Sequence, residues 1–116
     1  MFIAYAVVAV VFGLANVNSA VAKLRGVERV VGVLTAAGVP SSWFVPLALL
    51  NLAGAIGLWI GIAWRPLGIA AATGLVLYFA GAVITHVRVK DFKNVPVPAA
   101  LLAVAALTLA LAVASA

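Results

Sequence analysis

Most of the chemically capable side chains of this 116-residue chain interrupt long apolar stretches of sequence. A polar group is costly in such surroundings, so its presence indicates either ligand binding or hydrogen bonding between helices. Amides and hydroxyls both donate and accept hydrogen bonds, and an imidazole, which titrates at about pH 6.5, can carry a proton. The candidate ligand-binding residues are Asn16, Ser19, Lys23, Asn51, Tyr78, Thr85, His86 and Arg88.

Ordinary catalytic and metal-binding arrangements are not supported. The chain has no cysteine, one histidine and two acidic residues, Glu28 and Asp91, which lie far apart in the sequence. It contains no phosphate-binding loop and no dinucleotide-binding fingerprint. We therefore expect no metal site, and we favour a protein that is not an enzyme. Acid–base catalysis by His86, Lys23 or Tyr78 alone stays open.

Four apolar runs must position these side chains, and they cover residues 1–22, 43–64, 66–86 and 95–116. A helix needs roughly 20 mostly apolar residues to cross the hydrocarbon core of a bilayer, and each run meets that length. The first run lacks a basic start and is longer than the apolar part of a signal peptide, so we expect a retained span. The sequence thus predicts an all-α fold, with residues 1–116 forming one antiparallel bundle of four transmembrane helices.

The segment between the first two spans is more than a loop. Val27, Val30, Val31 and Leu34 recur at helical spacing, which predicts a short amphipathic helix lying at the membrane surface and ending near Gly38.

The ends of the other helices carry recognisable signals. Ser41 or Ser42 is expected to cap the second span, and Asn94 the fourth. Pro66 suits the first position of the third span, after a tight turn that makes the second and third spans neighbours.

Small residues predict where helices meet. Gly57 and Gly61 lie four residues apart in the second span, and Gly74 and Gly81 in the third are expected to pack in the same way.

The basic residues predict the topology. Six of the seven fall in the first and third connections, and only Arg65 lies in the second. The positive-inside rule makes the first and third connections cytoplasmic and places both termini outside. These charges suit contact with anionic lipid headgroups as well as any binding role, and we expect no nucleic-acid partner.

Each of the first three spans carries its polar residues in its cytoplasmic half. Asn16, Ser19 and Lys23 share one face of the first span, and Asn51 lies about two turns inside the second. We expect a polar pocket in the cytoplasmic half of spans one to three. The alternative is that these groups only hold the helices together by hydrogen bonds.

Several segments together resemble the DoxX-like membrane proteins. These are residues 22–24 (AKL) followed by 38–40 (GVP), residues 50–58 (LNLAGAIGL), and residues 81–88 (GAVITHVR). The resemblance covers roughly residues 10 to 110. It implies a four-helix bundle in a bacterial cytoplasmic membrane. Some members of the family are associated with thiosulfate oxidation by quinone, and others with oxidative-stress complexes.

One residue departs from the family pattern. Asn51 occupies a position that is commonly glutamate, and an amide cannot exchange a proton at neutral pH. It can still exchange hydrogen bonds with a quinone or lipid carbonyl.

Three functions are compatible with these features. The first is a quinone- or lipid-associated accessory protein of a membrane redox or stress-related system, which binds a hydrophobic small molecule in the polar pocket. The second is a small structural subunit of a larger membrane complex, without chemistry of its own. The third is a homo-oligomeric transporter or channel, which we rank last because no charged residue lies deep in a span.

Overall fold

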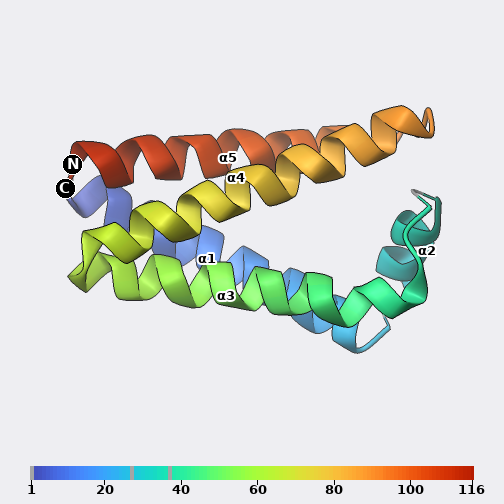
Figure 1. Ribbon diagram of the computed structural model, residues 1–116, viewed down its shortest axis with the longest axis horizontal. Coiled ribbons are helices and arrows are strands. Elements are labelled where there is room, and N and C mark those ends of the chain that lie inside the picture. The colour runs from blue at the N-terminus through green and yellow to red at the C-terminus, as the bar shows by residue number, and fades with distance from the viewer. Residues whose placement is uncertain (1, 27, 37) are drawn as a thin grey trace.

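A computed structural model describes residues 2–26, 28–36 and 38–116, and the regular elements within these ranges are helices (Figure 1). The elements are α1 (Phe2–Leu24), α2 (Glu28–Ala36), the 3-10 turn η1 (Ser41–Trp43), α3 (Phe44–Ala63), α4 (Arg65–Arg88) and α5 (Pro96–Ala114). By length and composition, α1, α3, α4 and α5 can each cross a membrane. The predicted all-α fold with four spans is confirmed.

Two of the predicted spans end later than expected. Helix α1 continues to Leu24 and α4 to Arg88, so Lys23 and His86 both lie in the last turn of a helix. Trp64 alone links α3 to α4, which confirms the tight turn. Because α4 begins with the preceding arginine, Pro66 occupies its second position and not its first.

The predicted caps of the second and fourth spans are wrong. Ser42 is part of η1, and α3 begins after Trp43 without a side-chain cap. Helix α5 begins after Val95, also without a side-chain cap, because the amide of Asn94 binds elsewhere. Val27 lies outside the described residues, as do the side chains of Arg29, Val30 and Ser41.

The long helices form a ring in which α1 contacts α3, α3 contacts α4, α4 contacts α5, and α5 contacts α1. Neighbouring helices run antiparallel (Figure 1). The start of α1, the α3–α4 turn and the end of α5 therefore share one end of the bundle, which we call the termini end. Helix α2 and the α4–α5 connection lie at the other end, the loop end.

The bundle is tightly packed near the termini end. Gly61 of α3 and Gly68 of α4 touch through their backbones, and a Cβ on Gly61 would overlap the Cα of Gly68. The Tyr5 hydroxyl lies against both glycines and donates to the Leu58 carbonyl at 3.0 Å. The Arg65 guanidinium covers the Tyr5 ring at 4.3 Å.

Not every predicted small-residue contact forms. Gly57 packs against Ala71, as close helix packing requires, but Gly74 and Gly81 face open space. The prediction that these two glycines pack against another helix is wrong, because α3 and α4 diverge on the way to the loop end (Figure 1).

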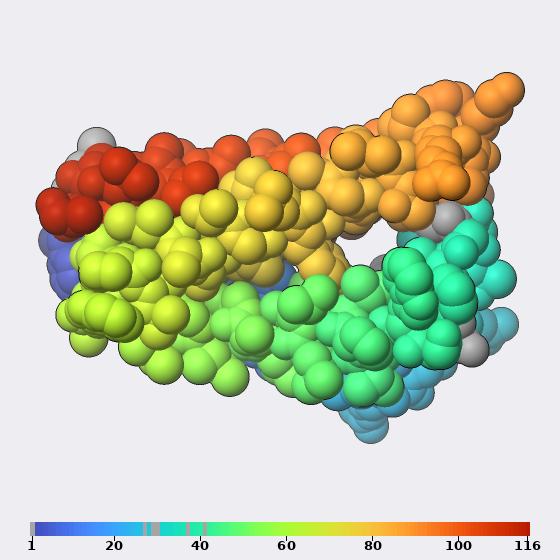
Figure 2. Space-filling model, in the orientation of Figure 1, coloured from blue at the N-terminus to red at the C-terminus, as the bar shows by residue number. Residues whose placement is uncertain are grey.

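The loop end is open. Figure 2 shows a hollow between the last turns of α4 and the first turns of α3, bordered by the segment that contains α2. Helix α2 is flanked by Gly26 and Gly38, whose φ angles of 66° and 79° lie in the left-handed region that favours glycine. The predicted short helix and its stop before Gly38 are confirmed.

Candidate functional site

Asn51 of α3 is the centre of a buried polar network. Its Nδ2 donates to Asn16 Oδ1 at 2.8 Å. Its Oδ1 accepts two hydrogen bonds, from Lys23 Nζ at 2.9 Å and from the Tyr78 hydroxyl at 3.1 Å. Because the Asn51 side chain is fully buried, these bonds replace the water that its amide would otherwise bind. One side chain thus ties α1, α3 and α4 together.

The α1 members of the network share one helical face. Asn16 Nδ2 donates back to the Phe12 carbonyl at 2.9 Å, which fixes the orientation of its amide. Lys23, one turn after Ser19, donates from Nζ to the Ser19 Oγ at 2.6 Å. The spacing of three and four residues brings these side chains to one stripe, as the sequence predicted. We call Asn16, Ser19, Lys23, Asn51 and Tyr78 the polar network.

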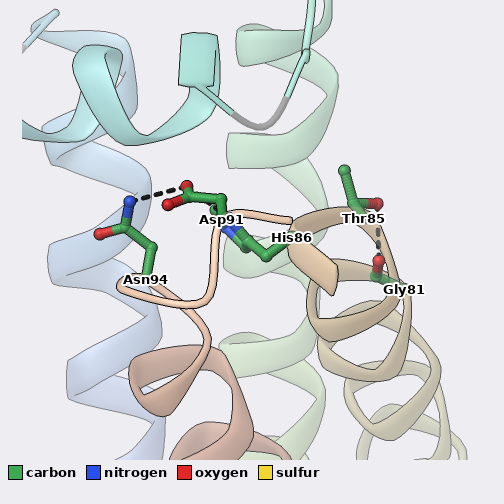
Figure 3. Close-up of polar contacts among 5 residues, drawn as sticks. All are labelled: Gly81, Thr85, His86, Asp91 and Asn94. Atoms are coloured by element: carbon green, nitrogen blue, oxygen red, sulfur yellow. Dashed lines mark hydrogen bonds and ion pairs between the residues drawn. The ribbon is translucent and has the colours of Figure 1, made fainter. Parts of the chain in front are cut away.

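His86 belongs to a second polar group at the loop end (Figure 3). Its Nδ1 lies 3.2 Å from Asp91 Oδ2, and the same oxygen accepts a hydrogen bond from Asn94 Nδ2 at 2.7 Å. A carboxylate only accepts, so Nδ1 carries the hydrogen of this bond and Nε2 is the ring nitrogen left for another partner. His86 is only 5 % exposed.

The environment of Asp91 stabilises its charged form. The hydrogen bond from Asn94 lowers the pKa of the Asp91 carboxyl below its ordinary value, and the contact with His86 acts in the same direction, although desolvation partly opposes both. The Asp91 backbone N–H also donates to the His86 carbonyl at 2.8 Å, which closes the end of α4. Asp91 therefore holds both the ring and the backbone of His86 in place.

Thr85 and Arg88 join neither polar group. The Thr85 hydroxyl donates to the Gly81 carbonyl of its own helix at 2.7 Å, and Figure 3 shows it on the other side of the helix end from Asp91. Arg88 is exposed.

Two pockets lie beside these groups at the loop end. The first, which we call the head pocket, has a volume of about 390 Å³. Its polar lining residues are Ser19, Lys23, Tyr78, His86 and Asn94. The rest of its wall is mostly apolar and comes from α2, α4 and α5, with Leu34, Phe79, Val97 and Leu101 among the contributors.

The second pocket, the side window, occupies the gap between α3, α4 and α2 that is visible in Figure 2. It has a volume of about 300 Å³, and Trp43, Leu47, Leu77 and Thr85 line it. Leu34, Tyr78, Ala82 and His86 line both pockets, so the two spaces adjoin across α4. A larger groove of about 470 Å³ on the α3–α4 surface is almost wholly apolar and touches the polar groups only at Tyr78.

The structure thus brings six of the eight candidate residues into the two polar groups near the loop end. Five form the polar network, and His86 shares the head pocket with three of those five. Thr85 reaches only the side window. Asp91 and Asn94 were missed as site residues, and the only signal for them was their position just after His86 at a helix end.

These features define a small multi-pass membrane protein, a helical bundle with polar groups gathered beside pockets at one end. The model of the DoxX-like family matches residues 7–108, and the chain belongs to that family. No curated protein and no solved structure gave a significant match.

Proposed function

We propose that this DoxX-like protein is an accessory protein of a membrane redox or stress-related system, and that it binds the polar head of a quinone or lipid in the head pocket. The observation that carries the proposal is the polar network under an otherwise apolar pocket. Ligand pockets typically combine an apolar wall with a few fixed polar groups, and their volumes run from about 300 to 1,000 Å³.

The members of the polar network have different roles in this proposal. Asn51 does not line the head pocket, and its oxygen already accepts two hydrogen bonds. We therefore assign it to positioning Lys23 and Tyr78, which do line the pocket. Lys23 has a third ammonium hydrogen, which can donate to a carbonyl or a headgroup oxygen, and His86 has a free Nε2, which can accept a hydrogen bond while Nδ1 carries the hydrogen.

The same end of the bundle also carries the charges that predict its orientation. Six of the seven basic residues lie at or near the loop end, in its connections or in the last turns of α1 and α4, whereas Arg65 begins α4 at the termini end. By the positive-inside rule the head pocket would face the cytoplasm of a bacterial plasma membrane, with both termini outside. The side window would then open sideways toward the inner leaflet.

Native mass spectrometry of the protein, extracted from its own membrane in a mild detergent, tests the proposal. We expect a stoichiometric quinone or lipid on the unmodified chain. Recovery of a stoichiometric partner protein with no small molecule would contradict the proposal and favour the structural-subunit function.

Two matched tyrosine variants localise the ligand. Tyr78→Phe removes the hydroxyl that binds Asn51, and Tyr5→Phe removes a hydroxyl that binds Leu58 near the termini end. Each loses one hydrogen bond, but only Tyr78 lines the pockets. We expect Tyr78→Phe to lower ligand occupancy and Tyr5→Phe to preserve it. Equal occupancy in both variants would place the ligand elsewhere.

A further inference from the structure

Lys23 is a buried cation that the chain itself does not neutralise. Its side chain is 8 % exposed, and its two hydrogen-bond partners, Ser19 and Asn51, are neutral. The chain has only two acidic residues. Asp91 is bound to His86 and Asn94, and Glu28 is exposed on α2. A buried charge is normally paired, because leaving it unpaired costs several kcal/mol.

The end of α1 compensates this charge only in part. Lys23 lies in the last turn of α1, where the carbonyl ends of the helix favour a cation. A helix end is equivalent to roughly half an elementary charge, so it balances only part of the charge of the ammonium. A further negative charge at the ammonium would therefore be stabilising.

The head pocket has free hydrogen-bond donors at this ammonium. One of the three Lys23 hydrogens has no acceptor among the described residues, and the same is true of the Ser19 hydroxyl hydrogen. Among the described residues, no carboxylate lines the head pocket. A site with one uncompensated positive charge and two free donors beside it matches an oxyanion better than a neutral carbonyl.

The apolar walls of the two pockets fit a hydrocarbon chain. Leu34, Phe79, Val97 and Leu101 surround the polar lining of the head pocket, and Trp43, Leu47 and Leu77 continue the apolar surface into the side window. Both volumes lie near the lower limit for ligand pockets, which favours one hydrocarbon chain over two.

We propose that the head pocket selects an anionic single-chain amphiphile, with its carboxylate or phosphate against Lys23 and its hydrocarbon chain extending toward the side window. This inference rests on the proposed function, since it names the charge of the ligand that the same pocket would bind.

Quenching of Trp43 fluorescence by brominated amphiphiles tests the charge directly. The full chain in neutral detergent micelles is titrated with dibromostearate, dibromostearyl alcohol and brominated lysophosphatidic acid. Trp43 lines the side window, so the part of the quenching that is lost in Trp43→Phe comes from brominated chains beside Trp43. We expect the two anions to quench at a concentration lower by a factor of about 10 or more than the alcohol, the size of effect expected for one buried charge pair.

Two variants then examine Lys23. Asn51→Asp places a carboxylate where the amide oxygen now lies 2.9 Å from Lys23 Nζ, so an internal anion would compete with the ligand. We expect this variant to bind the anions and the alcohol equally. Lys93→Gln removes one positive charge from an exposed site that lines neither pocket, and it should keep the wild-type preference.

The outcomes separate the two proposals. A preference for either anion over the alcohol supports the inference, and the preferred anion distinguishes a fatty acid from a phospholipid source. Equal quenching by the anions and the alcohol in the unmodified chain would overturn the inference but leave the proposed function standing. Quenching by none of the three probes would also overturn the inference, and the native mass spectrum would then decide the proposed function. The comparison of probes on the unmodified chain holds even where a variant fails to fold.

Discussion

The two ends of this bundle are built from the same helices but differ in how closely those helices pack. Near the termini end, Gly61 and Gly68 let α3 and α4 touch through their backbones, and Tyr5 fills the space beside them. Near the loop end the same two helices separate, and polar side chains and pockets lie between and beside them. Tight packing at one end can supply the stability that an open site at the other end gives up.

The two ends also differ in the partners of their tyrosine hydrogen bonds. Tyr5 at the closed end donates to a backbone carbonyl, which lies within the helix it packs against. Tyr78 at the open end donates to a side chain that two other residues also bind. Only the second arrangement can transmit a change at one member to several others, because the bonds share the Asn51 amide.

The largest effect is expected from Gly61→Val, which fills the closed end. The new side chain would collide with the Gly68 backbone, and backbone cannot move aside cheaply. Overpacking costs about 1–3 kcal/mol, and we expect a loss at or above the upper limit. Thermal unfolding in detergent measures it. Gly74→Val is the matched control, because its Cβ meets open space. Similar losses in both variants would mean that the contact with the Gly68 backbone does not explain the result.

A smaller effect is expected from Asn51→Leu at the open end. The variant removes the shared acceptor of Lys23 and Tyr78 and the donor to Asn16. Buried donors left without partners cost roughly 1–3 kcal/mol, and we expect a loss of about 2 kcal/mol.

A double-mutant cycle shows whether Asn51 and Lys23 act together. With Lys23→Met added to Asn51→Leu, no unpaired ammonium remains, so the double variant should lose less stability than the sum of the two single variants. Additive losses would show that the Lys23–Asn51 hydrogen bond contributes nothing to the fold.

Much of the fold and part of the candidate site follow from sequence because helical periodicity determines them. Run length gives the four spans, and the spacing of Asn16, Ser19 and Lys23 puts them on one face of α1. Antiparallel order then brings that face to the level of Asn51 and Tyr78.

No comparable periodicity governs the α4–α5 connection. Its shape depends on the bonds of Asp91 and on a left-handed φ of 59° at Lys90, for which a lysine gives no signal. The pairing of His86 was therefore not predictable.

The smallest effect concerns this connection, and its sign depends on pH. The folded state lowers the pKa of the Asp91 carboxyl, chiefly through the hydrogen bond from Asn94. A lowered pKa stabilises the fold at pH values above the ordinary carboxyl pKa, and the contribution is lost as the pH falls through the folded-state value. Asp91→Asn should therefore be slightly less stable than the wild type at neutral pH, and the difference should vanish in acid. Unfolding measured in detergent across this range tests the expectation.

Asp91 is partly exposed, so the loss in Asp91→Asn should be smaller than the loss in Asn51→Leu. A difference that persists in acid would mean that the bonds of Asp91 do not depend on its charge. The α4–α5 connection would then be held in place by its hydrogen bonds and backbone conformation and not by the carboxylate charge.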